Sequence, residues 1–460
     1  MKKYDVIIAG AGAAGVFLSY EMTKKENNAK ILMIDKGAPL EKRMCPIKRG
    51  VVENCVKCSP CHIMNGYGGA GTLSDGKYNI TTKFGGDLHA YVGVDKAMEL
   101  MEYVDSVLCE MGGAEAKLYS TADAGIKTQA LRNNLHLLDA KVRHLGTDRN
   151  VRILQKIYEY TRERIDMEFF TTIENVVHCE DGTFVISTDK GEEYSCNELV
   201  LATGRSGSKW IASVCDKLGV TQKSNRVDIG VRVELPAEIF KHITDEVYES
   251  KIVYKTEKYN DMVRTFCMNP YGEVVAENTN GIVTVNGHSY ADPELRTENT
   301  NFALLVSNTF TEPFRDSNEY GESIAKLSNM LGGGVLLQRF GDLVKGRRSS
   351  ERRMEKCFTR PTLKATPGDL SLVIPKRQLD SIIEMIYALD KIAPGTANED
   401  TLLYGVEVKF YNSKVEVDNN LETKIKGLYA LGDGSGVTHS LSQASASGVY
   451  VARLLADKYK

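Results

Sequence analysis

Three glycines near the start of the chain are spaced so that they could hold a phosphate group. Gly10, Gly12 and Gly15 lie in the run Gly-Ala-Gly-Ala-Ala-Gly, and Asp35 follows Gly15 by 20 residues. In this spacing the first glycine permits a tight turn, the second lets backbone approach a pyrophosphate, and the third lets a helix pack on a strand. The helix N-terminus attracts the phosphates, and the acidic residue can hold ribose hydroxyls. The pattern predicts a dinucleotide site that would serve FAD or NAD alike.

The surrounding residues predict the elements that such a site needs. Residues 4–9 and 31–34 are short apolar runs typical of buried strands, and Val16, Leu18 and Met22 mark a helix between them. Strand, helix and strand in this order form a βαβ unit with adjacent parallel strands. A plain glycine-rich turn is the alternative reading of the glycine run.

Two later strands end in further short motifs. Residues 198–204 end in Ala-Thr-Gly, and residues 428–433 end in Gly-Asp. Together with the glycine run, this order resembles the two-dinucleotide-fold flavoproteins, a superfamily that includes glutathione reductase and fumarate reductase. The resemblance implies FAD as the cofactor and a hydrogen bond from a ribityl hydroxyl to Asp433. It also implies a helix from about Ser440 to Gly448 whose positive end stabilises negative charge at the N1/O2 edge of the flavin.

A closer resemblance covers nearly the whole chain. It rests on residues 66–77, Gly-Tyr-Gly-Gly-Ala-Gly-Thr-Leu-Ser-Asp-Gly-Lys, and on the later stretches 228–234, 265–270, 285–289, 338–342 and 432–439. This set is similar to the FAD-dependent, or NAD(FAD)-utilising, dehydrogenases, and it implies fold and cofactor but no substrate. Gly68, Gly69 and Gly71 would let backbone approach the flavin at N5, where a side chain would block hydride transfer. A flexible lid is the alternative.

The motifs and the resemblance together give the expected FAD-binding residues. They are Gly10, Gly12, Ala13, Ala14, Gly15, Asp35, Lys36, Gly68, Gly69, Ala70, Gly71, Ser74, Asp75, Thr203, Gly204, Gly432, Asp433, His439 and Ser440. We expect His439 to lie near the flavin pyrimidine or to cap the following helix.

Four cysteines crowd one loop and could bind a metal. Their spacing is Cys45-x9-Cys55-x2-Cys58-x2-Cys61. Thiolates two residues apart can wrap a [4Fe-4S] cluster or zinc, and a cluster beside a flavin would pass single electrons from a ferredoxin-like donor. A redox disulfide, such as Cys55–Cys58 or Cys58–Cys61, and a set of unligated thiols are the alternatives.

Strand ends of a second domain present the candidates for catalysis. We expect catalytic roles for His288, Cys267, Asn286 and Ser289, in a domain that closes over the flavin face in this superfamily. Histidine is the side chain best suited to moving a proton near neutral pH, and a surface histidine is the alternative. Cys267 is alternatively a small buried residue.

Arginines at two places could bind an anionic substrate, because the guanidinium fork suits a carboxylate or a phosphate. One is Arg232, in an alternating strand pattern at 227–234. The other is a basic run, for which a solvated helix face is the alternative. Its members are Arg347, Arg348, Arg352, Arg353, Lys356 and Arg360.

Composition limits the class of protein and its surroundings. The chain has 460 residues, of which 42% are hydrophobic and 26% charged, and a net charge of −3, a profile typical of a soluble globular protein. This balance predicts no nucleic-acid partner and no membrane partner, and no apolar run is long enough to span a bilayer. The scattered cysteines outside the loop and the lack of a signal peptide predict a cytoplasmic protein.

The predicted fold is α/β. A Rossmann-like FAD-binding domain would contain a parallel sheet and a β-meander, with strands near 172–178, 183–188 and 197–203, beside a mostly antiparallel α+β substrate domain. The predicted boundaries are 1–225 for the first part of the FAD-binding domain, 226–394 for the substrate domain and 395–460 for the return segment.

The predicted function is that of an FAD-dependent oxidoreductase, which transfers a hydride between flavin N5 and a small, anionic substrate as a dehydrogenase or reductase. No second glycine fingerprint appears. The electrons would therefore come from transient NAD(P)H, from a ferredoxin-like donor through the cysteine loop, or from the substrate. The alternatives are a tRNA-modifying flavoprotein, which needs a basic face, and a non-enzymatic flavin redox-sensing module.

Overall fold

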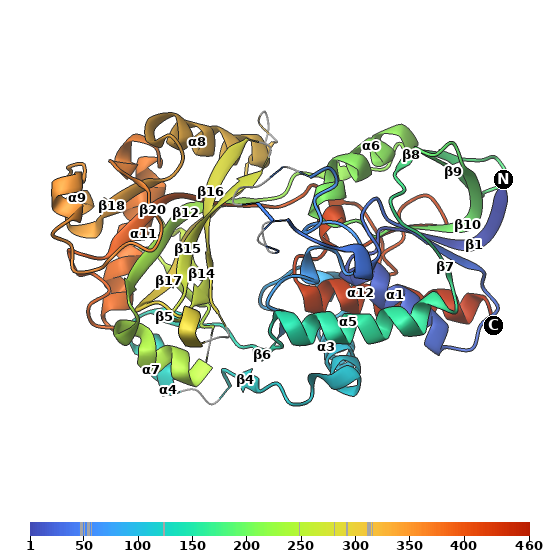
Figure 1. Cartoon of the computed structure of the whole chain (residues 1–460), viewed down its shortest axis with the longest axis horizontal. Helices are drawn as coiled ribbons and strands as arrows, with labels where there is room; N and C mark the ends of the chain where they lie inside the picture. The colour runs from blue at the N-terminus through green and yellow to red at the C-terminus, as the bar shows by residue number, and fades with distance from the viewer. Residues whose placement is uncertain are drawn as a thin grey trace. The chain divides into compact units, whose positions relative to one another are not determined.

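The chain folds into two compact units, which are described separately (Figure 1). The computed structural model describes residues 1–46, 49, 51–52, 56, 58–122, 125–247, 249–279, 281–290, 293–310, 314 and 316–460. The first unit comprises residues 1–118, 141–223 and 412–460, and the second comprises residues 119–140 and 224–411.

A parallel sheet forms the centre of the first unit. Its strands are, in order, β7 (Asp166–Glu168), β2 (Ile31–Ile34), β1 (Lys2–Ala9) and β10 (Glu193–Leu201), and β22 (Leu428–Ala430) pairs with the carboxyl half of β10. The amino half of β10 pairs antiparallel with β9 (Phe184–Thr188), which pairs with β8 (Ile173–His178). The predicted parallel sheet and β-meander are therefore confirmed.

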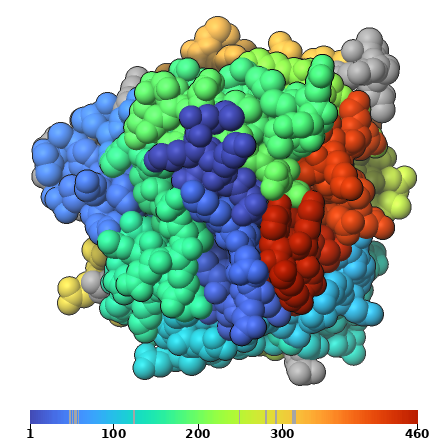
Figure 2. Space-filling model, turned by 90° about the vertical axis from the view of Figure 1, so that its right-hand side faces the viewer, coloured from blue at the N-terminus to red at the C-terminus, as the bar shows by residue number. Residues whose placement is uncertain are grey.

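Both faces of this sheet are covered, as strongly apolar parallel strands require. Side chains of β1 alternate between two cores, with Val6 and Ile8 in one and Ile7 and Ala9 in the other. The first core contains α1 (Ala13–Lys24), α3 (Val94–Leu108), α5 (Thr147–Arg162) and α12 (Leu441–Lys458), and the second contains α6 (Ser208–Leu218) and the meander. Helices α1 and α12 lie side by side in Figure 1, and Figure 2 shows the N-terminal residues beside the C-terminal helix.

The remaining elements of the first unit are short. Strand β3 (Lys77–Ile80) pairs antiparallel with β6 (Lys141–His144), and β11 (Gln222–Lys223) pairs with β21 (Lys414–Val415). Helix α2 (Leu88–Val92) follows β3, and β4 (Leu118–Ser120) runs across the division of the chain.

A mostly antiparallel sheet forms the second unit. Its strand order is β19 (Thr366–Pro367), β18 (Leu336–Arg339), β20 (Leu402–Phe410), β12 (Val227–Pro236), β17 (Asn299–Asn308), β14 (Met262–Asn269), β13 (Ile252–Lys255) and β5 (Leu135–Leu137). Strands β15 (Glu273–Thr279) and β16 (Ile282–His288) form a separate hairpin. The helices are α4 (Gly125–Arg132), α7 (Ala237–Val247), α8 (Ser317–Gly332), α9 (Phe340–Val344), α10 (Glu351–Met354) and α11 (Lys376–Asp390).

The two faces of this sheet differ in chemistry, and β12 shows why. Its residues Val227, Ile229, Val231 and Val233 join the apolar core of the unit. Alternate residues point to the other face, since successive side chains of a strand alternate. Asp228, Arg232 and Glu234 of β12 lie there, opposite Lys409 and other residues of β20. We call this the polar face of the second unit.

The predicted fold class is confirmed, but two boundaries differ from those expected. The second unit extends to Tyr411 rather than to 394, because β20 pairs with both β12 and β18. It also includes residues 119–140, because β5 pairs with β13. Neither pairing could be read from the sequence, since each joins strands far apart in the chain. In the described part of the chain, no helix combines the length and the apolar character that crossing a membrane takes.

Candidate functional site

The glycine turns of the first unit converge at the carboxyl ends of β1, β10 and β22. The Gly68 N–H donates to the Ala11 carbonyl at 2.7 Å, which joins the glycine loop to the turn after β1. The Gly434 N–H donates to the Thr203 carbonyl at 3.0 Å, which joins the turns after β22 and β10. The motifs that the sequence marks are therefore neighbours, as binding of one shared cofactor requires.

Two glycines show how closely the backbone segments approach. A Cβ on Gly15 would lie 2.1 Å from the Gly10 carbonyl oxygen, so α1 begins in contact with the turn that precedes it. Gly69 has a φ of +59°, and a Cβ there would lie 3.0 Å from the Gly12 Cα. A side chain at either position would push the two backbone segments apart. This close approach is the reason that the fingerprint requires a glycine at position 15.

Asp35 follows β2 and binds the backbone of this region. Its Oδ2 accepts from the Ala11 N–H at 2.8 Å, and its Oδ1 accepts from the N–H groups of Gly37 and Gly66 at 2.7 and 3.0 Å. An ionised carboxylate offers about four lone-pair positions, so about one remains for a further donor. A ribose hydroxyl would suit that position.

A cavity of about 680 Å³, its open mouth included, lies over the converging turns. The lining includes the expected residues Gly10, Gly12, Asp35, Lys36, Gly69, Thr203 and Gly204. It also includes residues that sequence reasoning missed, among them Met64, Asn65, Thr171, Thr172, Ser206 and Trp210.

Two polar atoms of this lining have no hydrogen-bond partner among the described residues. They are Thr203 Oγ1 and Trp210 Nε1, and both atoms are shielded from solvent. Leaving such a group without a partner is destabilising by about 1–3 kcal/mol, so the pair fits a site built for a polar ligand. With the backbone amides and Asp35 they form a donor and acceptor set that fits the adenine dinucleotide part of FAD. The one sequence signal for Trp210 is that it is the single tryptophan of the chain.

Arg43 binds the backbone of the glycine loop. Its guanidinium donates to the carbonyl oxygens of His62, Ile63, Tyr67 and Gly69 at distances between 2.7 and 3.1 Å. Burial lowers the pKa of Arg43 to about 10, against the opposing effect of Asp35, so the group stays charged at neutral pH. Sequence reasoning missed this residue because a lone arginine in a loop forms no motif.

The turn after β22 presents a second set of polar groups. Asp433 Oδ1 lies 3.0 Å from His439 Nδ1, and Asp433 Oδ2 lies 3.4 Å from Arg205 Nε. A ribityl hydroxyl at Asp433 would share the carboxylate with these two groups. Ser440, not His439, caps α12, because its Oγ accepts from the Gln443 N–H at 3.2 Å.

The other expected FAD-binding residues occupy the edges of this region. Ala13 and Ala14 form the first turn of α1, Gly68 and Ala70 lie at a short 3-10 helix with Gly71, and Gly432 precedes the Asp433 turn. Ser74 Oγ donates to the Gly71 carbonyl at 2.7 Å. Burial would raise the pKa of Asp75, but Lys77 and His144 outweigh it and hold that pKa well below its usual range. Contacts of these residues with the cofactor stay predictions.

Three of the four loop cysteines are described. Cys45, Cys58 and Cys61 are half-buried free thiols, and Cys55 lies outside the described residues. Within the described ranges, no group of three or more His, Cys, Asp or Glu side chains is arranged to hold a metal ion. A four-cysteine cluster or zinc site needs Cys55, so both hypotheses stay predictions.

The expected catalytic residues belong to the second unit. Asn286 Oδ1 and the Cys267 carbonyl each accept from Arg232 at 2.9 Å, and Cys267 lies at a bulge of β14 with a φ of +42°. His288 is exposed at the end of β16. Ser289 Oγ is shielded and has no partner among the described residues. Their catalytic roles stay predictions.

Arg232 cannot serve as the expected clamp for a substrate anion. It is fully buried, and its guanidinium binds both oxygens of Glu407 at 2.6 and 2.7 Å. It also donates to the Cys267 carbonyl, to Asn286 Oδ1 and to Asn301 Oδ1 at 2.9, 2.9 and 3.2 Å. A guanidinium has five N–H donors, and all of them are used. The prediction is wrong because a new anion would have to displace a buried partner.

The basic run is partly structural and partly solvated. Asp342 is fully buried and accepts from Arg347 Nε at 2.7 Å and Ser349 Oγ at 2.8 Å, with Arg353 Nε at 3.8 Å. Arg352 is exposed, as are Lys356 and Arg360. Two of the six members, Arg347 and Arg353, are therefore explained by one buried carboxylate.

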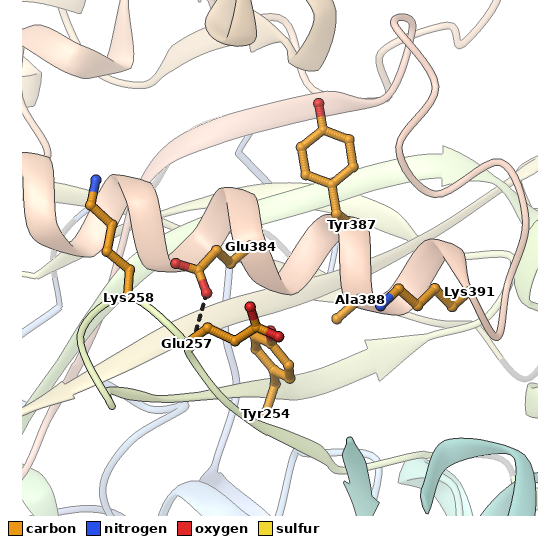
Figure 3. A pocket seen from close by; sticks show the side chains of 7 residues that line it. All are labelled: Tyr254, Glu257, Lys258, Glu384, Tyr387, Ala388 and Lys391. Carbon is orange, nitrogen blue, oxygen red and sulfur yellow. Dashed lines mark hydrogen bonds between the residues drawn. The ribbon is translucent and has the colours of Figure 1, made fainter. Parts of the chain in front are cut away.

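A second hollow in the second unit lies between the turn after β13 and helix α11 (Figure 3). Glu384 accepts from the Glu257 N–H at 2.9 Å, Lys258 binds Asp380 at 2.7 Å, and Tyr387 points away from the carboxylates. None of its lining atoms is among the shielded, unpartnered polar atoms of the described chain. This hollow therefore shows no sign of a ligand.

Comparisons with known proteins agree with the assignment of a flavin site. Residues 226–410, the long segment of the second unit, match the family model described as FAD-dependent protein, C-terminal domain-like. An uncharacterized protein from Clostridium beijerinckii (strain ATCC 51743 / NCIMB 8052) is 26% identical over 479 residues, which cover 98% of this chain and 81% of that protein.

Solved structures align over the whole chain at low scores. Glycine oxidase from Geobacillus kaustophilus is 11% identical, with 100% of this chain and 96% of that chain covered and a TM-score of 0.42. L-Proline dehydrogenase from P. horikoshii is 13% identical, with 100% and 95% covered and a TM-score of 0.43. At these scores the alignments add no argument about fold or activity. The fold and the cavity of the first unit agree with the FAD-dependent match over the second unit.

Proposed function

We propose that the first unit binds one FAD and that the protein transfers a hydride between flavin N5 and a small molecule, as a dehydrogenase or a reductase. The observation that carries this proposal is the cavity in which Thr203 Oγ1 and Trp210 Nε1 lack partners, at the point where the glycine motifs converge. When bound, FAD supplies the two-electron chemistry, and the protein supplies binding, orientation and charge.

Each part of the cofactor has a candidate partner. The turn at Gly10 and Gly12 and the N-terminus of α1 would bind the pyrophosphate, where N–H groups and the helix dipole favour negative charge. Asp35 would accept from a ribose hydroxyl. The N-terminus of α12, capped by Ser440, would stabilise negative charge on the flavin ring.

The substrate reaction also needs a proton and an electron partner. In the oxidising direction, the hydride carries two electrons from a substrate carbon, and a proton from the adjacent O–H or N–H passes to His288 or to water. The electrons then leave to an external acceptor, either NAD(P)⁺ or a ferredoxin-like protein. A reductase would run the same steps in reverse.

Binding of FAD can be measured with the protein's own reporter. Trp210 is the single tryptophan and lines the cavity, so FAD binding should quench its fluorescence. Thr203→Val and Trp210→Phe each remove one unpartnered polar atom. We expect each to weaken FAD binding by about 2- to 10-fold, followed by flavin absorbance in equilibrium dialysis.

Thr188→Val is the matched control, because the Thr188 hydroxyl is buried in the same unit but pairs with the Glu192 backbone at the end of β9. It should leave FAD affinity unchanged. Protein that is colourless as purified and shows no quenching with added FAD would refute the proposal. Anaerobic mixing of FAD-loaded protein with small hydroxy and amino acids, read as loss of flavin absorbance, then tests the hydride step. An iron assay on anaerobically purified protein tests the cysteine loop separately.

A further inference from the structure

Three cationic side chains surround one aromatic ring on the polar face of the second unit. Lys409 Nζ lies 3.6 Å from the centre of the Phe266 ring, and Lys251 Nζ lies 4.2 Å from it. The Arg264 guanidinium lies 5.3 Å from the same centre. Cations are attracted to the face of an aromatic ring, but three of them within this distance also repel one another.

Two of these cations have an anion beside them, and the third does not. Arg264 binds the buried carboxylate of Asp228, and Lys251 Nζ lies 3.4 Å from Glu249. Lys409 Nζ has neither a hydrogen bond nor an ion pair with any described residue, although an ammonium has three donors. The donors of this ammonium are therefore available to one more negative group.

The electrostatics of Lys409 point the same way. Burial, followed by the charges of Lys251 and Arg264, lowers the pKa of Lys409 to about 7, against smaller opposing effects of Cys267 and Asp228. A cation in such surroundings is stabilised by any anion that comes within contact distance.

We propose that Lys409, with Lys251 and Arg264 beside it, binds the carboxylate of a small anionic molecule on the polar face of the second unit. This inference stands on the second unit alone and goes beyond the proposed function. A carboxylate carries the single negative charge that one unpartnered ammonium can balance. A phosphate monoester brings about −1.5 to −2 at neutral pH and would leave charge uncompensated.

Titration of FAD-loaded protein with benzoate, followed by isothermal titration calorimetry at pH 6.5, tests the site. Lys409→Met should weaken benzoate binding about tenfold or more, because it removes a charged hydrogen bond. Lys409→Arg should restore most of the affinity. The matched control is Lys391→Met, the same change at an exposed lysine of the second unit, which should bind like the parent protein.

The affinity should also fall as the pH rises from 6 to 9, because the ammonium of Lys409 is lost in this range. The other charged or titratable groups around Lys409 are Asp228 on β12, Arg264 and Cys267 on β14, Lys251 before β13, Glu407 on its own strand and Tyr411 directly after it. The Lys391→Met protein should show the same pH dependence, whereas the weak binding of Lys409→Met should vary much less.

A second readout does not depend on FAD. At pH 8 an amine with a lowered pKa reacts early with trinitrobenzenesulfonate, and peptide mass spectrometry locates the modified lysine. Benzoate should protect Lys409 from the reagent, and benzyl alcohol, which lacks the charge, should not.

Equal benzoate affinity in the parent and Lys409→Met proteins would overturn the inference, and so would binding of inorganic phosphate but not of benzoate. Protein that binds benzoate through Lys409 but never binds FAD would leave the anion site standing and refute the oxidoreductase. Full flavin absorbance without benzoate binding that depends on Lys409 would leave the FAD site standing and refute the anion site.

Discussion

Arg232 and Lys409 are two cations on the same face of one sheet, and their surroundings are opposite. Every N–H of Arg232 donates to a described acceptor, drawn from β14, β16, β17 and β20. The Lys409 ammonium contacts aromatic rings and has no acceptor among the described residues. A cation whose donors are all bound within the protein, such as Arg232, stabilises the fold. A cation with unused donors, such as Lys409, is suited to bind an anionic ligand.

The energetics of Arg232 follow from its partner as much as from itself. Glu407 is buried, and burial raises its pKa even though Arg232 opposes the shift. Removing one member of a buried ion pair leaves an uncompensated charge, which destabilises far more than replacing both members. Breaking the Arg232–Glu407 ion pair to bind a substrate would therefore destabilise the fold.

Arg232→Met should have the largest effect of the changes considered. We expect a loss of about 3–5 kcal/mol in the free energy of unfolding, because Glu407, the buried Asn301 amide and the half-buried Asn286 amide lose their donor. Urea unfolding followed by far-UV circular dichroism measures it. The double change Arg232→Met with Glu407→Leu should recover part of the loss. A single change that lowers stability by less than 1 kcal/mol would contradict the structural role given to Arg232.

Asp342→Asn should be the next largest, with a loss of about 1–3 kcal/mol. The buried carboxylate of Asp342 accepts from Ser349 and Arg347 and lies near Arg339 and Arg353, so an amide would keep its shape but lose its charge. The same unfolding experiment applies. High salt should change the loss little, since the carboxylate is fully buried. A salt-dependent loss would indicate that these arginines are held by solvent-exposed charges instead.

The sequence predicted the converging glycine turns of the first unit better than the polar face of the second, because the glycine motifs are local in the chain. Gly10, Gly15 and Asp35 lie within one strand–helix–strand segment, so their spacing alone determines the turn that they form. Arg232 and Glu407 are 175 residues apart and meet because β12 pairs with β20. Nothing in the residues around Arg232 indicates that its donors are already used.

The same reasoning explains what was missed in the cofactor region itself. Trp210 and Arg43 reach the cavity and the glycine loop from segments without motifs, and their roles depend on tertiary packing. His439 was expected near the flavin or as a helix cap. Ser440 takes the cap because a serine hydroxyl reaches the N–H three residues on, as favoured at helix starts.

Lys409→Met should stabilise the protein, in contrast to Arg232→Met, and by a smaller amount. At pH 6 we expect a gain of about 0.5–2 kcal/mol, because a poorly accommodated charge is removed. The folded-state pKa lies below the unfolded value. Below pH 7 the parent protein therefore bears the full free-energy cost of holding the Lys409 ammonium in the folded state. From pH 7 to about 10 the folded state loses this proton while the unfolded state keeps it, so the free energy of unfolding rises. The advantage of Lys409→Met should shrink over this range, as measured by thermal unfolding at stepped pH. A constant difference would mean that Lys409 is not the titrating group.

Arg352→Ala should have the smallest effect and sets the lower limit of the comparison. Arg352 is exposed in α10, one residue before Arg353, which lies near the buried Asp342. An exposed arginine in a helix contributes little to stability, so we expect a change within about 0.5 kcal/mol in urea unfolding. Arg347→Ala, which removes a 2.7 Å contact with Asp342, should cost clearly more. Equal losses of unfolding free energy for Arg352→Ala and Arg347→Ala would show that a buried acceptor does not decide how much an arginine contributes to stability. The distinction drawn between Arg232 and Lys409 would then lose its basis.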